Sequence, residues 1–266
     1  MAERKRIMEM PTTRRRNQKY LILDTESIWD PYLREAYDSI DRKNDHARIG
    51  CRKLIAVSLW AIEFDALGRL STEPLQTWLA TEGLTESDIL SQAFQTMRRY
   101  SDHVLVGHGS IAHDCQIMML AAMSADLELP RQLQPPEGPR WRDLRHIDIG
   151  LAMKAGGKTW HHLSELLLRL GLPVGLMIGK ADPGVREKEI RWSTLQEHCE
   201  RDVLFTSLAL TALLRLEGQV PTTILGMHLA LCEAFLRQRP QAICAPLLRR
   251  YADEIRATLI PAPLAA

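Results

Sequence analysis

The sequence predicts an α/β fold in which a mixed β-sheet is covered by helices. Short runs rich in β-branched, aromatic and other apolar residues predict strands at 21–26, 54–64 and 103–106. Apolar residues at helical spacing predict helices at 85–100 and 193–216. Strands come first and then alternate with helices, which favours one α/β domain. A chain of 266 residues with 45% apolar content can bury a large single core.

The other elements follow from local signals. Thr85 and Asp88 have the spacing of a capping box, and Ser193 and Gln196 have a similar spacing at the start of the longest helix. The remaining expected elements are a polar loop at 27–50, a turn at 65–68 leading to a strand at 69–75, a helix after 109, a connection at 130–138, a strand at 144–149, a helix from 158 or 159 to 170, a loop at 174–191 and a helical region from 222 to about 259.

Composition narrows the class of protein. The five cysteines form no CxxC pair, no apolar run is long enough to cross a bilayer, and the chain begins without the pattern of a signal peptide. We therefore expect a protein of the reducing cytoplasm.

Charge is unevenly distributed along a chain whose net charge is only +1. Residues 1–19 hold seven lysines and arginines against two glutamates, so we expect a basic, mobile arm that is either simply solvated or adds phosphate contacts. We place one domain at 20–218 and a C-terminal helical extension, packed on the same domain, at 219–266.

Two acids end the first strand. Because side chains alternate along a strand, Asp24 and Glu26 point to the same side. Two carboxylates in one place raise each other's pKa, and a hard divalent cation compensates for their crowding. The alternative is a strand whose acids lie at a solvated end.

Three more residues extend this pair. His198 and Asp202 are four apart, hence on one face of a helix whose apolar stripe would hold it against the sheet. Asp114 follows a strand and begins a helix, where an acid also has the simpler role of stabilising the helix dipole.

The order of these residues resembles the DEDD group of 3′-5′ exonucleases, which share a ribonuclease H-like fold. The resemblance is closest to predicted exonucleases related to the proofreading domain of family B DNA polymerases, and it covers roughly residues 20 to 216. It is carried by Leu-Asp-Thr-Glu at 23–26, Leu-Val-Gly-His at 105–108 with Asp114 downstream, His-Ile-Asp-Ile at 146–149, Leu-Gly-Leu-Pro at 170–173 and His-Cys-Glu-Arg-Asp-Val at 198–203.

The resemblance implies that Asp24, Glu26, Asp114 and Asp202 hold two divalent cations, Mg²⁺ or Mn²⁺. Asp24 would bridge the ions, Glu26 and Asp202 would complete the site that activates water, and Asp114 would act on the second ion. Two such ions about 4 Å apart supply a nucleophilic water and a charge clamp on the leaving oxygen. His198 would orient the water and take its proton.

The chain also departs from the family pattern. The family has Tyr four residues, or His five residues, before its last Asp, whereas His198 stands four before Asp202 and so occupies the tyrosine position. His108 and Ala112 stand where the family usually has Asn and aromatic residues. The resemblance therefore does not establish a platform on which bases would stack. We keep Asp148 outside the metal set, as an outer or structural acid.

We therefore expect a metal-dependent 3′-5′ exonuclease acting on single-stranded nucleic acid, with DNA favoured over RNA. Three arginines around Trp141 (Arg140, Arg142, Arg145) either line a channel for the nucleic acid or form an ordinary charged loop. Two alternatives stay open: a nucleic-acid-binding module on the same fold that has lost catalysis, and a 3′-5′ exoribonuclease.

Overall fold

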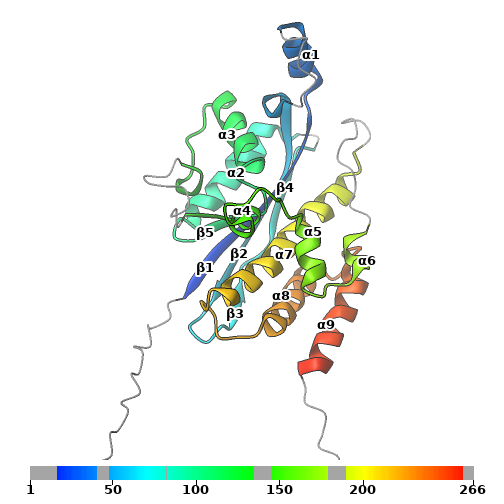
Figure 1. Ribbon diagram of the computed structural model, residues 1–266. Coiled ribbons are helices and arrows are strands. Elements are labelled where there is room, and N and C mark those ends of the chain that lie inside the picture. Colours follow the sequence, from blue (N-terminus) through cyan, green and yellow to red (C-terminus); the bar gives the residue numbers. More distant parts are fainter. Residues whose placement is uncertain (1–16, 41–47, 82, 135–144, 179–189, 260–266) are drawn as a thin grey trace, which may run out of the picture.

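The computed structural model describes residues 17–40, 48–81, 83–134, 145–178 and 190–259. Six strands form one mixed sheet whose two faces are covered by helices (Figure 1). The predicted fold class is confirmed, and the arrangement is compatible with the ribonuclease H-like fold. The basic arm at 1–16 and the arginines at 140 and 142 lie outside the described residues.

The sheet is built around one long strand, β1, which is paired on both sides. β1 is antiparallel to β2 and parallel to β5, which in turn is parallel to β6. β3 and β4 pair with successive parts of β2 and together form the other edge of the sheet. The strands are β1 (Gln18–Trp29), β2 (Arg52–Phe64), β3 (Leu70–Thr72), β4 (Gln76–Leu79), β5 (Val104–Gly107) and β6 (His146–Asp148).

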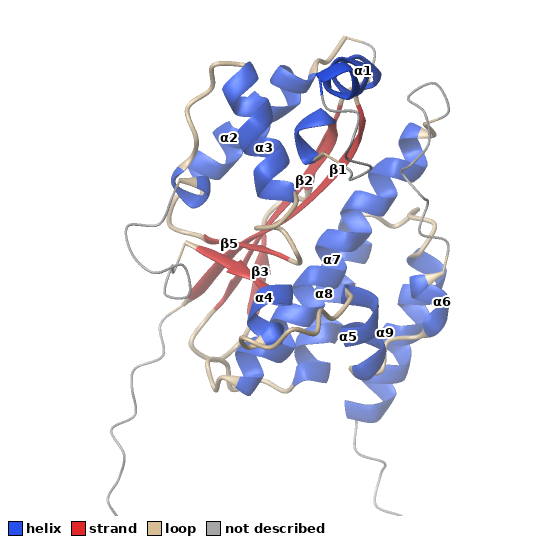
Figure 2. Cartoon of the chain, turned by 45° about the horizontal axis from the view of Figure 1, so that its top comes forward, coloured by secondary structure: helices blue, strands red, loops and turns tan. Residues whose placement is uncertain are grey.

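Helices lie on both faces of this sheet (Figure 2). They are α1 (Pro31–Ile40), α2 (Glu86–Arg99), α3 (Asp114–Ser124), α4 (Ile149–Lys154), α5 (Leu163–Arg169), α6 (Val174–Met177), α7 (Trp192–Leu216), α8 (Ile224–Gln238) and α9 (Ala245–Leu259), with short 3₁₀ helices at Ile49–Cys51 and Arg131–Leu133.

The alternation of β1 side chains divides the core into two layers. Tyr20 and Ile22 pack in the apolar cluster that includes α7, α8 and α9. Leu21 and Leu23 point the other way, into the cluster that includes α2 and α3. A strand covered on both faces reads as a continuous apolar run, which is the pattern of residues 20–23. The C-terminal helices thus share a core with the α/β domain, and β1 includes the last two residues, 18 and 19, of the predicted arm.

Most predicted elements are present, and the capping box of Thr85 and Asp88 is confirmed. The predicted loop at 27–50 was wrong over most of its described part, because β1 continues to Trp29 and α1 begins at Pro31. Helix α1 buries no residue, but Leu33, Ala36, Tyr37 and Ile40 recur at helical spacing, so the sequence held a periodic signal that the prediction missed. Proline at the first position of α1 lacks an N–H, but the first turn of a helix has no intrahelical partner for that donor.

The remaining differences concern boundaries and short elements. Arg191, rather than Ser193, is the N-cap of α7. The helix expected from 158 or 159 begins at Leu163, α6 lies within the expected loop at 174–191, and β4 and α4 were not predicted. These elements have four to seven residues, too few to establish a period.

All five cysteines are free and buried. Across the described ranges, no helix combines the length and the apolar character needed to cross a membrane.

Candidate active site

The acids of β1 lie on the face of the sheet that is covered by α7. The alternation that turns Tyr20 and Ile22 toward α7 places Asp24 and Glu26 there too. Glu26 is buried, whereas Asp24 keeps part of its side chain accessible to solvent. The register with β2 shifts directly after Glu26, and such a bulge increases the local twist and commonly lies beside functional sites.

Helix α7 brings His198 and Asp202 to these strand acids. Nδ1 of His198 lies 3.1 Å from Oε1 of Glu26, and Nε2 lies 3.6 Å from Oδ2 of Asp202. The thiol of Cys199 donates a hydrogen bond to the backbone oxygen of Asp24 at 3.4 Å, which ties the same turn of α7 to β1. Asp24 and Cys199, which are 175 positions apart in the chain, are therefore in contact.

Asp114 reaches the cluster from the opposite face of the sheet. It is the first residue of α3 and is buried. The hydroxyl of Thr25, which lies between the two strand acids and points away from α7, donates a short hydrogen bond to Oδ1 of Asp114. The carboxylate of Asp114 is thus held at the backbone of β1 where Asp24 and Glu26 are attached.

The four acids form one electrostatic unit. Burial raises the pKa of Asp24 well above its ordinary value, and the negative charges of Asp202, Glu26 and Asp114 raise it further, in that order. Burial also raises the pKa of Asp114 to about 6, against the hydrogen bond from Thr25, which lowers it. Oδ2 of Asp24 is buried and has no hydrogen-bond partner among the described residues.

This donor set suits a hard cation in its chemistry. Carboxylate oxygens are the ligands that Mg²⁺ and related ions prefer, and an unsatisfied carboxylate oxygen surrounded by like charge is stabilised by a positive ion. Among the described residues, however, no three His, Cys, Asp or Glu side chains are arranged so that they could hold a metal ion as they stand.

His198 lies between Glu26 and Asp202, with a ring nitrogen toward each carboxylate. A protonated imidazole in this position would form an ion pair with each acid and offset part of their repulsion. To accept a proton from water, the ring would have to release one of these two contacts. The histidine in the tyrosine position is therefore placed within the acid cluster rather than at its edge.

Asp148 has a structural role. Its carboxylate accepts hydrogen bonds from the backbone N–H groups of Gly109 (2.9 Å), Ile111 (3.0 Å) and Leu151 (3.2 Å). The first two belong to the turn between β5 and α3, so Asp148 fixes the chain just before Asp114.

An aromatic side chain from the connection between α4 and α5 packs against the same turn. The ring of Trp160 packs edge-on against His108, with centroids 5.6 Å apart. Gly109 and Gly150 make room for the indole, since a Cβ built at Gly150 would lie 2.4 Å from a Trp160 ring atom. Sequence reasoning did not single out Trp160. It also missed Thr25, although its place between two acids on a strand was a usable signal.

Comparison with known proteins gives little at the level of sequence. Searches found no match for this chain among protein-family descriptions or among curated proteins. The structure is similar to that of the family B DNA polymerase from the hyperthermophilic archaeon Pyrobaculum calidifontis, with a TM-score of 0.48 and 14% sequence identity. The match covers 91% of this chain and 29% of the polymerase chain, so the chain spans less than a third of that polymerase.

Proposed function

We propose that the protein is a metal-dependent 3′-5′ exonuclease that hydrolyses phosphodiester bonds of single-stranded nucleic acid, with DNA favoured over RNA. The observation that carries the proposal is the carboxylate of Asp24, whose Oδ2 lacks a hydrogen bond within the described residues and lies in the field of three further acids. The ordered sequence blocks around the same residues give the proposal its reaction class.

The acids Asp24, Glu26, Asp114 and Asp202 would hold the cations. Mg²⁺ or Mn²⁺ bound there would supply Lewis acidity that lowers the pKa of water and stabilises negative charge on the leaving oxygen. Asp24, which every other acid of the cluster affects, is the residue best placed to contact both ions. Cation binding would also relieve the repulsion that raises the pKa of Asp24.

His198 would orient the water and accept its proton. In the cluster it is held by Glu26 and Asp202. With the oxygens of Glu26 and Asp202 bound to cations, one ring nitrogen of His198 would contact water instead of a carboxylate. His198 would therefore act as a base only in the loaded site.

The test is the release of mononucleotides from a 5′-labelled single strand with Mg²⁺ or Mn²⁺. Asp24→Asn and Asp202→Asn keep the size of the side chains and should reduce turnover by more than about 100-fold, since even outer partners of metal ligands cost 10- to 100-fold. Asp253→Asn, on the exposed side of α9, is a matched control and should keep full activity. Equal activity in all three variants would remove the proposed mechanism.

A second candidate is a nucleic-acid-binding module that has lost catalysis. It is favoured by His198 in the tyrosine position, with both ring nitrogens directed at carboxylates. Tight binding of a single strand without metal-dependent turnover at any pH would select this candidate. Parallel assays on DNA and RNA strands of one sequence would separate a deoxyribonuclease from an exoribonuclease.

A further inference from the structure

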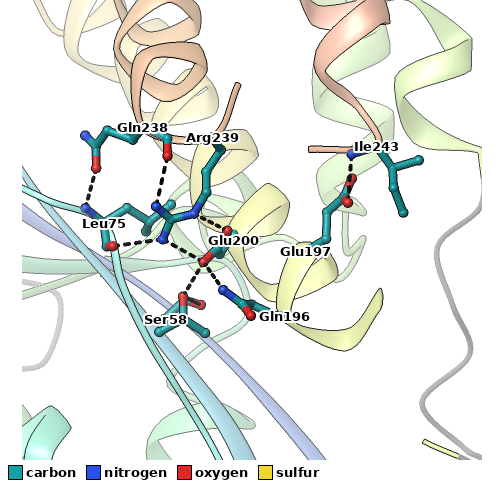
Figure 3. A network of polar contacts seen from close by, with 9 residues as sticks. Ser58, Leu75, Gln196, Glu197, Glu200, Gln238, Arg239 and Ile243 are labelled. Carbon is teal, nitrogen blue, oxygen red and sulfur yellow. Dashed lines mark hydrogen bonds and ion pairs between the residues drawn. The ribbon is translucent and has the colours of Figure 1, made fainter. Parts of the chain in front are cut away.

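The opposite side of α7 carries a buried acid, Glu200, between His198 and Asp202 in the sequence. Successive helical residues are 100° apart, so a residue two positions from both His198 and Asp202 faces away from them. Glu200 is only 3% exposed, and its carboxylate receives hydrogen bonds from the side chains of Arg239, Thr77 and Gln196 (Figure 3).

The Arg239 contact is bidentate. Its Nε lies 2.6 Å from Oε2 of Glu200, and its Nη2 lies 2.8 Å from Oε1. Two parallel hydrogen bonds between a planar guanidinium and a carboxylate fix orientation as well as distance, which the single point charge of a lysine cannot do. The pair therefore restricts the rotation of α7 about its own axis.

Arg239 is also hydrogen-bonded to the edge of the sheet. It directly follows α8, and its Nη2 also donates to the backbone oxygen of Leu75 at 3.0 Å. The neighbouring Gln238 accepts from the backbone N–H of Leu75 at 2.6 Å and donates to the oxygen of Glu73 at 3.2 Å. The end of α8, the connection between β3 and β4, and α7 thus form one network (Figure 3).

A second set of hydrogen bonds links the same turn of α7 to the start of α9. The carboxylate of Glu197 accepts from the backbone N–H groups of Ile243 (2.8 Å) and Cys244 (2.9 Å), just before α9 begins at Ala245. Glu197 and Glu200, on one turn of α7, are therefore both bonded to the C-terminal extension. The same turn carries His198.

We infer that Glu200 and Arg239 are positioning residues, which hold α7 at the rotation that directs His198 and Asp202 toward Asp24 and Glu26. The C-terminal helices would thus serve the site itself, as well as adding to the core. The kinetic part of this inference rests on the proposed exonuclease function, whereas the placement of α7 does not. A misplacement of about 1 Å at a reacting group can cost about 100-fold in rate, so small rotations of α7 would matter.

The test uses Arg239→Gln and Arg239→Lys in the full chain, with Tyr251→Phe as the control. The hydroxyl of Tyr251 lies 2.9 Å from Nδ1 of buried His228, whose Nε2 contacts the backbone oxygen of Leu208 in α7 at 3.2 Å. Tyr251→Phe keeps the second contact, so it should lower stability without turning α7. We expect Arg239→Gln to lower kcat on a single strand by about 10- to 100-fold with little change in KM. Arg239→Lys should retain more of the rate than Arg239→Gln, because lysine keeps the positive charge but cannot form the two parallel hydrogen bonds.

Alkylation of Cys199 measures the placement of α7 without any activity. This thiol is fully buried and bonds to the backbone of Asp24, so a rotated α7 should expose it. Peptide-resolved mass spectrometry should show faster modification of Cys199 in Arg239→Gln, with Cys115 of α3 unchanged and with no change in Tyr251→Phe. If Arg239→Gln folds poorly, Arg239→Lys supplies both readouts.

Unchanged kcat and unchanged Cys199 alkylation in Arg239→Gln would overturn the inference. Equal loss of kcat in Arg239→Gln and Tyr251→Phe, at matched stability, would also overturn it by indicating general destabilisation. A wild-type protein without nuclease activity would refute the proposed function instead. In that case faster alkylation of Cys199 would still support the positioning of α7, and unchanged alkylation would refute it.

Discussion

Replacement of Asp114 by Asn should stabilise the metal-free protein. Burial raises the pKa of Asp114 from 3.8 to about 6, so the folded state holds the charged carboxylate at a cost. Asparagine has nearly the same shape, and its side-chain oxygen can still accept the hydrogen bond from Thr25. The substitution therefore removes the charge while preserving the contact.

The sign and size of the effect follow from proton linkage. Because the folded state binds the proton of Asp114 more tightly, the contribution of Asp114 to stability is most favourable below pH 3.8 and falls as the pH rises to about 6, above which the full penalty is present. A shift of roughly 2 units at 1.36 kcal/mol each corresponds to ~3 kcal/mol. Asp114→Asn should thus gain about 3 kcal/mol at pH 8 and about half of that at pH 5. At pH 8 the melting temperature should rise by about 6–12 °C.

Thermal and urea denaturation in EDTA at the two pH values measures this gain. Asp88→Asn is a control of opposite sign, since the pKa of Asp88 is lowered by its hydrogen bonds to Thr85 in the capping box. It should destabilise the protein at pH 8. A neutral or destabilising Asp114→Asn at pH 8, or a gain of equal size at both pH values, would refute the reasoning. Added Mn²⁺ should stabilise the wild type more than the variant if Asp114 contributes to cation binding.

Three further substitutions probe the scaffold of the site. Asp148→Ala should lower the free energy of unfolding by about 2–4 kcal/mol, because three backbone N–H groups lose their acceptor. Urea denaturation measures this loss, and a value below about 0.5 kcal/mol would contradict the prediction. Gly150→Ala would place a Cβ 2.4 Å from the Trp160 ring, so the indole should move. A shift of the tryptophan emission would report the movement, and an unaltered spectrum in a folded variant would contradict it. Phe235→Ala removes a fully buried ring that packs edge-on against Trp60, and we expect a loss of about 3–5 kcal/mol in a melt, unlike a surface substitution.

Local periodicity accounts for the part of the site that sequence could foresee. Alternation along β1 places Asp24 and Glu26 together, and the spacing of four places His198 and Asp202 together, whatever the rest of the fold does. Both pairs are in the expected arrangement, and the strand pair is covered by the helix that carries the other pair. The apolar runs of β1, β2 and α7 similarly indicated the fold class.

Local signals were weak where an element gains its order from pairing. Strand β1 extends to Trp29 because β2 continues to pair with it beyond the bulge, although residues 27–29 follow two acids. Helix α1 is a different case, because Leu33, Tyr37 and Ile40 do recur at helical spacing and this local signal was overlooked. Boundaries such as the start of α7 at Trp192 likewise depend on packing that a cap signal at Ser193 did not represent.

By itself, the sequence determined which residues share a face within each strand or helix, because backbone geometry repeats every 2 or 3.6 residues. Only the tertiary structure decided that Asp114 meets Thr25 from the opposite side of the sheet and that Glu200 pairs with Arg239, 39 positions away. Such contacts join separate elements whose relative placement is set by the packing of the whole core. A chain position records the order of these residues, whereas their distance is a property of the folded molecule.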